Sequence, residues 1–410
     1  MRGQIKILNK FIYVVMIVVV GFTSLGLTSN ENEKKIHSNI TIENIDVGKL
    51  TKKQAIKKLE AKYPLKDFYI TWGNEKWAIE AKSIDLDYHI EERVNEAFNY
   101  TRDTSMLENI KRKGKLKLKK SHNIRLKATY DEIKLSKELK VICRAINVDA
   151  VDASFHVELS GEIKRTKSKE GKKVDLSRLK ENIYDMINKK KIENINLPVL
   201  TSYPKVSTEQ VKSINSILGQ FSTSFNDSTS RGSNIHVAGE STSDILLMPG
   251  ETFSYNKRTG ARNWVNGYKS APIIVGGKVT NGEGGGVCQV STTIYNAALL
   301  SGLTIDEVHN HSLPSKYAPK GRDATVSYGY TDLKFTNPYT HPVYIKNIVG
   351  NGAITSKIYG CNLDRERISI RMIEEYTKNK ITVQTYRLYL DEENNIVRKE
   401  LVNTSVYKPY

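Results

Sequence analysis

The sequence predicts an α+β protein built from short strands and amphipathic helices. Three features support this prediction. An uncharged apolar segment follows a basic N-terminus, two strand-and-helix patterns of similar order come next, and a glycine-rich stretch then opens a buried helix close to a cysteine. We therefore expect a single N-terminal membrane anchor, a duplicated α+β region, and a mixed α+β domain whose central cysteine-bearing helix packs on antiparallel strands.

The composition is that of a folded and strongly basic protein. Hydrophobic residues make up 39% and charged residues 26% of the 410 residues, which is ordinary for folded domains and sufficient for two or three of them. The net charge of +18 is carried mostly by lysines spread along the chain, and it favours contact with polyanions. Three cysteines, an odd number, leave at least one thiol free or paired between chains.

The N-terminus indicates export. Residues 1–10 carry basic side chains and no acid, and residues 11–27 carry no charge. Because the positive charge precedes the apolar segment, the N-terminus should stay inside the cell. We expect a cytoplasmic basic tail at 1–10, a single-pass signal anchor in the cytoplasmic membrane at 11–29, and an extracytoplasmic linker at 30–38. The alternative is secretion after signal cleavage. Outside the cell, the expected partner is an anionic wall polymer and not nucleic acid.

Residues 39–204 are predicted to form two α+β units of similar order. The first has a strand within 40–45, a helix at 52–61 capped by Thr51, a hairpin at 68–79 and a helix at 90–100. The second has strands at 124–129, 153–159 and 162–164, helices at 133–146 and 176–188, and a closing strand at 195–200. A run of seven positive charges within 111–120 is predicted to be a solvated edge.

This region resembles a known family at both of its ends. Residues 45–55, IDVGKLTKKQA, are similar to the opening of the domain named for peptidoglycan binding in YoaR-like exported proteins. Residues 197–199 and 204–207 are similar to the end of that domain. The resemblance implies that residues 39–204 contact the cell wall, with peptidoglycan or another anionic wall polymer as the partner.

A second resemblance covers residues 205–360. It rests on a series of motifs in a fixed order: GQFSTSF at 219–225, RGSNI at 231–235, MPGETFSYN at 248–256, TGAR at 259–262, HNHSLP at 309–314, GRDATV at 321–326 and DLKFTN at 332–337. These motifs are similar to the VanW domain, and they imply a VanW-family cell-envelope protein. The chain departs from the family pattern before His311, where Glu307-Val308-His309-Asn310 replaces an arginine-containing run. Residues 361–410 are predicted as a short β-rich extension with strands at 368–372, 381–390 and 396–407.

The stretch around Cys288 is the candidate functional centre. Gly284, Gly285 and Gly286 precede it, and apolar residues at helical spacing follow it, so Cys288 should lie in the first turn of a buried helix. Unpaired N–H groups and the helix dipole at that end lower the pKa of a thiol. The alternative interpretation is a small buried hydrophobic residue behind a tight turn or an anion-binding nest.

Downstream residues suggest partners for this thiol. His311 would take its proton, and Asp323 would orient the imidazole. Backbone N–H groups at Cys288 and Gln289, or the Gln289 side chain, would bind the oxyanion. His309 is the competing base. The order of cysteine, histidine and aspartate is similar to a transglutaminase core by fold-level analogy.

Two classes of function remain open. One is a cysteine-dependent amide hydrolase or acyltransferase acting on wall peptides. The other is a non-catalytic peptidoglycan-binding or envelope-assembly protein in which Cys288 is structural. The predicted substrate-binding residues are the three glycines at 284–286 with Arg262, Tyr268, His309 and Arg322. No cofactor or metal is expected, because the histidines are scattered along the sequence without ligand spacing.

Overall fold

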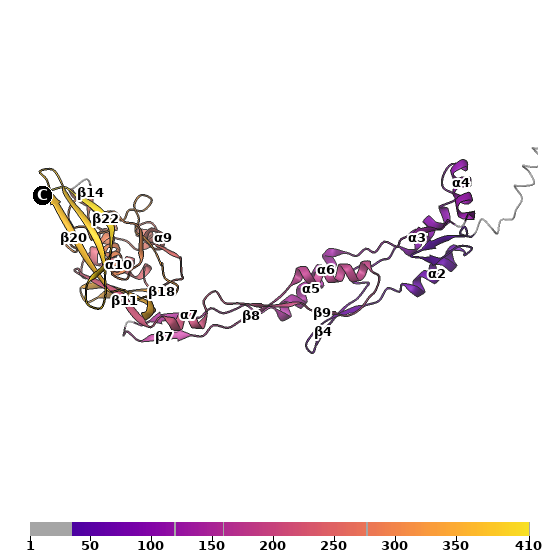
Figure 1. Cartoon of the computed structure of the whole chain (residues 1–410), viewed down its shortest axis with the longest axis horizontal. Coiled ribbons are helices and arrows are strands. Elements are labelled where there is room, and N and C mark those ends of the chain that lie inside the picture. Colours follow the sequence, from indigo (N-terminus) through magenta and orange to yellow (C-terminus); the bar gives the residue numbers. More distant parts are fainter. Residues whose placement is uncertain (1–34, 119, 159, 276–277, 410) are drawn as a thin grey trace, which may run out of the picture. The chain divides into compact units, whose positions relative to one another are not determined.

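The computed structural model describes residues 35–409 except 119, 159, 276 and 277 (Figure 1). The predicted basic tail and signal anchor therefore lie outside the described residues. Among the helices of the described part, none is long and apolar enough to cross a bilayer. The chain divides into two compact units, one running to Asp149 and including Lys172–Thr201, and the other comprising Ala150–Gly171 and Ser202–Tyr410.

Two three-stranded sheets lie in the first unit, and each joins a hairpin to a strand from much later in the chain. The first sheet has the order β2-β1-β5, and the second has the order β4-β3-β9. The hairpin strands pair antiparallel, whereas β5 and β9 add in parallel. Their bounds are β1 Ile40–Ile42, β2 Ile45–Asp46, β3 Phe68–Trp72, β4 Glu75–Ile79, β5 His122–Ile124 and β9 Ile195–Asn196.

Five helices complete this unit: α2 Lys52–Lys62, α3 Ile90–Asn99, α4 Met106–Lys117, α5 Glu132–Ile146 and α6 Leu176–Asn188. The predicted helices are confirmed to within two residues, because each has a capping side chain or a clear apolar stripe. Thr51, for example, forms a capping box with Gln54 at the start of α2. The apolar stripes of α2, α3, α5 and α6 meet in one hydrophobic core.

Three predictions for this region need correction. The lysines described in the segment 111–120 are exposed, as predicted for a solvated edge, but the segment as far as Lys117 belongs to helix α4, where Ser105 caps the first turn. The predicted strand at 124–129 is shorter and earlier, as β5. The predicted closing strand at 195–200 is split into β9 and β10 (Val199–Ser202), and β10 pairs with β8 (Gly171–Val174). Pro198 lies at the break, and it has no N–H to donate to a ladder.

The second unit is built around a four-stranded antiparallel sheet of order β11-β19-β18-β12. Its strands are β11 Ser216–Ser224, β12 Ile245–Leu247, β18 Val343–Gly350 and β19 Ala353–Gly360. Helix α10 (Val287–Leu300) packs on β11 and β19, and α8 (Ser230–Ser241) packs on β18 and on α10. The prediction of a mixed α+β fold with a cysteine-bearing helix on antiparallel strands is therefore confirmed.

Smaller elements surround this centre. They are the hairpin β6 Ser154–Val157 with β7 Ile163–Thr166, helices α7 Thr208–Ser213 and α9 Tyr255–Thr259, the 3-10 turn η1 Trp264–Asn266, the hairpin β14 Ser270–Val275 with β15 Lys278–Glu283, and the sheet of β13 Thr252–Ser254, β17 Lys334–Thr336 and β16 Thr304–Glu307. The β6–β7 hairpin packs on Tyr344 and Tyr359, so residues 150–171 join this unit.

The C-terminal residues form the predicted antiparallel sheet, with strands β20 Ile368–Tyr376, β21 Ile381–Leu390 and β22 Ile396–Tyr407 after the 3-10 turn η2 Asn362–Asp364. This sheet is bound to the cysteine-bearing part of the unit. The buried Arg387 side chain donates to the Leu303 carbonyl at 2.8 Å, and Thr385 donates to the Gly321 carbonyl at 2.8 Å. Figure 1 shows its yellow strands beside α10. The sheet can therefore supply side chains to the site.

Candidate active site

Helix α10 places Cys288 at its second residue. Gly286 is the N-cap with a φ of 114°, a conformation that side chains other than glycine rarely adopt. Gly285 is needed for a different reason. A Cβ there would lie 2.7 Å from the Pro272 oxygen, so the backbone of β14 itself fills the space beside it. The three glycines are buried, and they bring the chain's own backbone against the start of the helix.

Side chains of α10 hold the segment that carries Asp323. Ser291 donates to the Ala324 carbonyl at 2.6 Å, and the Thr292 hydroxyl accepts from the Ala324 N–H at 2.9 Å. At the first turn, the buried Tyr255 hydroxyl donates to the Val287 carbonyl at 2.9 Å. These bonds fix Cys288 and Asp323 relative to one another, although they lie far apart in the sequence.

His311 and Asp323 form a buried ion pair. The His311 Nδ1 lies 2.6 Å from Asp323 Oδ2, and the His311 backbone N–H donates to the same oxygen at 2.7 Å. The Asp323 side chain is 1% exposed, and that of His311 is 13% exposed. The second carboxylate oxygen accepts a hydrogen bond from Tyr407 of β22. Three donors thus satisfy this buried carboxylate, and its bond to Nδ1 directs the other nitrogen of the imidazole toward the thiol.

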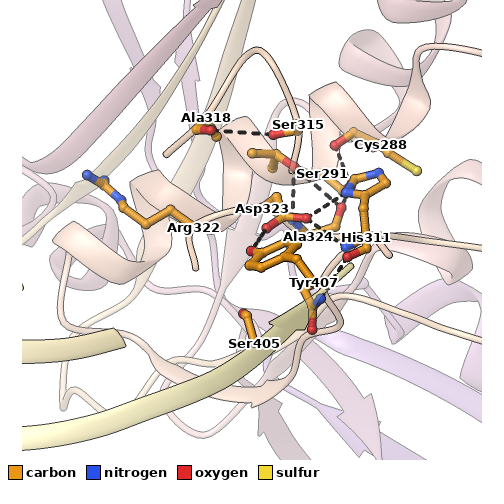
Figure 2. Close-up of polar contacts among 12 residues, drawn as sticks. Cys288, Ser291, His311, Ser315, Ala318, Arg322, Asp323, Ala324, Ser405 and Tyr407 are labelled. Atoms are coloured by element: carbon orange, nitrogen blue, oxygen red, sulfur yellow. Dashed lines mark hydrogen bonds and ion pairs between the residues drawn. The ribbon is translucent and has the colours of Figure 1, made fainter. Parts of the chain in front are cut away.

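Cys288 lies on the other side of this imidazole. Figure 2 shows its sulfur next to the His311 ring, opposite the nitrogen that faces Asp323. Burial raises the pKa of the Cys288 thiol, but the hydrogen bond and the positive charge of His311 outweigh burial and lower that pKa overall. Burial lowers the pKa of His311, but Asp323 and Cys288 raise it to about 9. Each shift stabilises the charged form of its own group, which is the thiolate for Cys288 and the imidazolium for His311.

Two further contacts bear on this pair. The Tyr317 hydroxyl lies 3.4 Å from His311 Nε2. The Cys288 thiol lies 3.6 Å from the Val326 carbonyl, to which it can donate. Tyr317 thus closes one side of the imidazole, and Val326 offers the protonated thiol a partner.

The structure separates the two histidines. The His309 side chain is 47% exposed, and its Nε2 lies 3.1 Å from Glu307 Oε1. It is not part of the contacts between His311, Asp323 and Cys288. The irregular backbone after β16 explains the difference, because residues two apart share a face only in a regular strand.

The Gln289 side chain forms hydrogen bonds to other parts of the fold. It is buried, its amide donates to Thr223 at 3.0 Å and to the Ser224 carbonyl at 2.8 Å, and its oxygen accepts from Arg231 at 2.8 Å. Its backbone N–H donates to the Gly286 carbonyl at 3.0 Å. The structure therefore directs Gln289 toward β11 and α8, and the Cys288 N–H is the better candidate for an oxyanion donor.

The remaining predicted groove residues are dispersed. Tyr268 is buried in the hydrophobic core of the second unit. Arg322 donates to Asn296 at 2.6 Å and stacks on Phe221, and Figure 2 shows its side chain pointing away from Cys288. Burial lowers the pKa of Arg322.

Arg262 is the predicted groove residue with a direct effect on the thiol. Its positive charge contributes to the lowered pKa of Cys288. Its Nη2 donates to Asn256 at 2.5 Å, while Nε and Nη1 are buried without a hydrogen-bond partner among the described residues. A guanidinium with unused donors is the kind of group that binds a carboxylate in two-pronged fashion, so Arg262 stays a candidate binding residue.

Sequence reasoning missed Tyr407 and Tyr317. Tyr407 lies in the C-terminal extension, which showed only strand periodicity, and nothing local links it to Asp323. Tyr317 lies six residues after His311 in an irregular loop. Tyr317 contacts His311 and Tyr407 contacts Asp323, and only the folded chain reveals which of the 22 tyrosines reach this pair.

Two family models match the chain. Residues 230–359 match the family described as "VanW like protein", and residues 77–195 match the family described as "Putative peptidoglycan binding domain". Both segments lie inside the regions where the sequence showed these resemblances. The predicted resemblance is confirmed, and the chain carries a domain of each kind.

Curated relatives agree with the family models. The chain is 40% identical over 176 residues to the uncharacterized protein YoaR of Bacillus subtilis (strain 168), which is 42% of this chain and 58% of the relative. It is 34% identical over 109 residues to the vancomycin B-type resistance protein VanW of Enterococcus faecalis (strain ATCC 700802 / V583), which is 25% of this chain and 40% of the relative. The matches thus span about half the length of these relatives. No solved structure matches the chain.

Proposed function

We propose that this chain, with its VanW-like domain and its domain of the peptidoglycan-binding type, performs cysteine-dependent acyl chemistry on amide bonds of wall peptides. One observation carries the proposal. A single imidazole contacts the Cys288 thiol at one nitrogen and a buried carboxylate at the other. This is the arrangement by which an imidazole activates a nucleophile and then returns a proton.

The chemistry follows from the positions of these groups. The Cys288 thiolate attacks the amide carbonyl carbon and forms a C–S bond, and the Cys288 N–H at the helix start stabilises the oxyanion. His311 then donates its proton to the departing amine as the C–N bond breaks, which leaves a thioester. Water, deprotonated by His311, attacks the thioester in hydrolysis, and an amine does so in acyl transfer. In both cases the thiolate is regenerated.

The rest of the chain supports an extracytoplasmic location. Residues 11–29 act as a single-pass anchor in the cytoplasmic membrane, because a basic segment precedes an uncharged one. The net charge of +18 and the domain of the peptidoglycan-binding type suit contact with anionic wall polymer. The alternative of secretion after signal cleavage leaves the same chemistry outside the cell.

One observation favours the second candidate function, a non-catalytic wall-binding or envelope-assembly protein. The contact between the Cys288 thiol and the Val326 carbonyl fits a protonated sulfur that serves only in packing. The two functions differ in the charge state of the thiol at neutral pH, which is measurable.

The test is the pH dependence of Cys288 alkylation by iodoacetamide in the folded full-length chain, followed by peptide mass mapping. Because the pKa of Cys288 is lowered, we expect half-maximal reactivity below about pH 8.5. Cys143 is an internal control, since burial raises its pKa and it should react only at higher pH. His311→Gln should slow the alkylation of Cys288 about tenfold or more at pH 7, because a rise of about one unit in the pKa of the thiol lowers the thiolate fraction tenfold.

His309→Gln is the matched variant, because this exposed histidine contacts Glu307 and not the thiol. It should leave the Cys288 profile unchanged. Half-maximal reactivity of Cys288 at or above pH 8.5, or a profile that His311→Gln does not move, would contradict the catalytic proposal and support the binding protein.

A further inference from the structure

Three side chains with metal-ligating atoms meet at the open end of the β18–β19 hairpin. His341 precedes β18, whereas Cys361 and Asp364 follow β19. The antiparallel pairing of the hairpin, with Tyr344 opposite Tyr359, brings these flanks together. One nitrogen of His341, the Cys361 sulfur and one Asp364 oxygen lie within 4.8 Å of one another. We call these residues the hairpin trio.

The spacing of the hairpin trio fits one small cation. Ligands at about 2.0–2.3 Å from a tetrahedral zinc ion are about 3.3–3.8 Å from each other. The His341 Nδ1 already lies 3.1 Å and 3.2 Å from the two Asp364 oxygens. Closing the remaining distances requires shifts of about 1 Å or less, which side-chain rotation can supply.

Cys361 is unusual for a buried thiol. It is 4% exposed and free, yet it belongs to none of the hydrophobic clusters formed by the described residues. A buried cysteine is ordinarily a small hydrophobic residue in such a cluster. Here its sulfur lies instead beside a half-buried imidazole and a carboxylate, which are polar groups.

We propose that the hairpin trio binds a divalent transition-metal ion of the zinc class. Thiolate, imidazole and carboxylate together favour this class over magnesium and calcium, which take oxygen ligands. Binding forms metal–sulfur, metal–nitrogen and metal–oxygen bonds and releases the Cys361 thiol proton to solvent, with no change of oxidation state. Three protein ligands leave a fourth position for water.

The place of this site suggests a structural role. A bound ion would join the base of the β18–β19 hairpin to η2, and η2 leads directly into β20. It would thereby fix the start of the C-terminal sheet, whose last strand supplies Tyr407 to Asp323. The proposal does not depend on the chemistry of Cys288, because none of the hairpin trio contacts that thiol in the described structure.

Cobalt is a suitable probe, because thiolate ligation gives a Co²⁺ charge-transfer absorption in the near ultraviolet. The test uses the full-length chain with Cys143→Ala and Cys288→Ala, so that Cys361 is the remaining thiol, after chelator treatment under reducing conditions. We expect about one Co²⁺ per chain with this absorption. Cys361→Ser should abolish it, and His341→Gln and Asp364→Asn should each weaken binding about tenfold or more.

His236→Gln is the matched control, because His236 pairs with Asp227 at 2.8 Å with no cysteine in that pair. It should leave cobalt binding unchanged. Zinc at about 100 times its Kd should raise the Tm of the second unit by about 5–10 °C, and the three trio variants should lose that rise. If Cys361→Ser fails to fold, the variants at His341 and Asp364, whose side chains are 32% and 11% exposed, still decide the question. Absence of the thiolate absorption, or a cobalt affinity that is unchanged in both His341→Gln and Asp364→Asn, would overturn the proposal.

Discussion

Each group of the candidate active site is defined by the atoms that it contacts. Asp323 receives two hydrogen bonds from His311 and one from Tyr407, so its charge is satisfied although it is buried. The imidazole has one nitrogen fixed by that carboxylate and the other directed to Cys288. The raised pKa of His311, about 9, is the consequence, because two acidic partners outweigh burial.

Tyr407 offers a test at this scale. Its hydroxyl donates to Asp323 and accepts from the Gly321 N–H at 2.7 Å, so Tyr407→Phe leaves two buried groups without this partner. We expect the free energy of unfolding of the second unit to fall by about 1–3 kcal/mol in urea titrations. Tyr386→Phe on β21 removes a half-buried hydroxyl bound to Gln384 and should cost about 0.5 kcal/mol or less. Equal losses in the free energy of unfolding would show that the Tyr407–Asp323 contact stabilises the fold no more than the half-buried Tyr386 hydroxyl does.

The sequence predicted the members of this site unevenly. Cys288 could be predicted because glycines precede it and an apolar helical stripe follows it, and His311 and Asp323 were then predicted from their order in the chain. The direction of the Gln289 side chain could not be predicted, because helical spacing does not say whether a residue at the first turn faces β11 or the thiol. The choice between His309 and His311 depended on an irregular backbone, and Tyr407 lies 84 residues from Asp323. Such contacts are properties of the tertiary fold.

At the scale of elements, the site depends on how closely β14 approaches the start of α10. Gly285→Ala would place a Cβ 2.7 Å from the Pro272 oxygen and 2.8 Å from Ala271 backbone atoms, which cannot move independently. We expect this variant to destabilise the second unit by about 3 kcal/mol and to raise the half-maximal pH of Cys288 alkylation.

Gly329→Ala is the control for backbone strain alone. Gly329 has a φ of 82° with open space around it, so alanine there should cost about 1 kcal/mol. Both variants can be compared by urea unfolding. If Gly285→Ala is as stable as Gly329→Ala, then the backbone of β14 does not exclude a side chain at position 285.

Local signals predicted elements better than pairings. The helices at α2, α5 and α6 each have a capping side chain and an apolar stripe, and both signals lie within the element itself. The pairing of β1 with β5 and of β3 with β9 joins strands far apart in the sequence, and periodicity cannot reveal it. The lysine-rich α4 was missed because charge dominates its composition, although Ser105 provides a helix cap.

At the scale of the whole molecule, two units carry two different tasks in our account. The first unit carries most of the match to the peptidoglycan-binding family, and the second carries the match to the VanW family and the cysteine site. A net charge of +18 favours retention on anionic wall polymer. This retention should weaken as salt is added, because salt screens the attraction. We therefore expect the chain to stay bound to the wall when Cys288 is replaced, while its chemistry on the wall stops.

The most direct measurement is a mass analysis of purified peptidoglycan after incubation with the full-length chain or with Cys288→Ala. We expect the wild-type chain to hydrolyse an amide bond of the wall peptides or to join its acyl group to an added amine. The rate should fall below the pKa of Cys288, as the thiolate is lost, and again above about pH 9, as the His311 imidazolium is lost. Cys288→Ala should bind the same wall material without changing it. Identical peptidoglycan masses after incubation with the two chains, while both remain bound, would contradict the account.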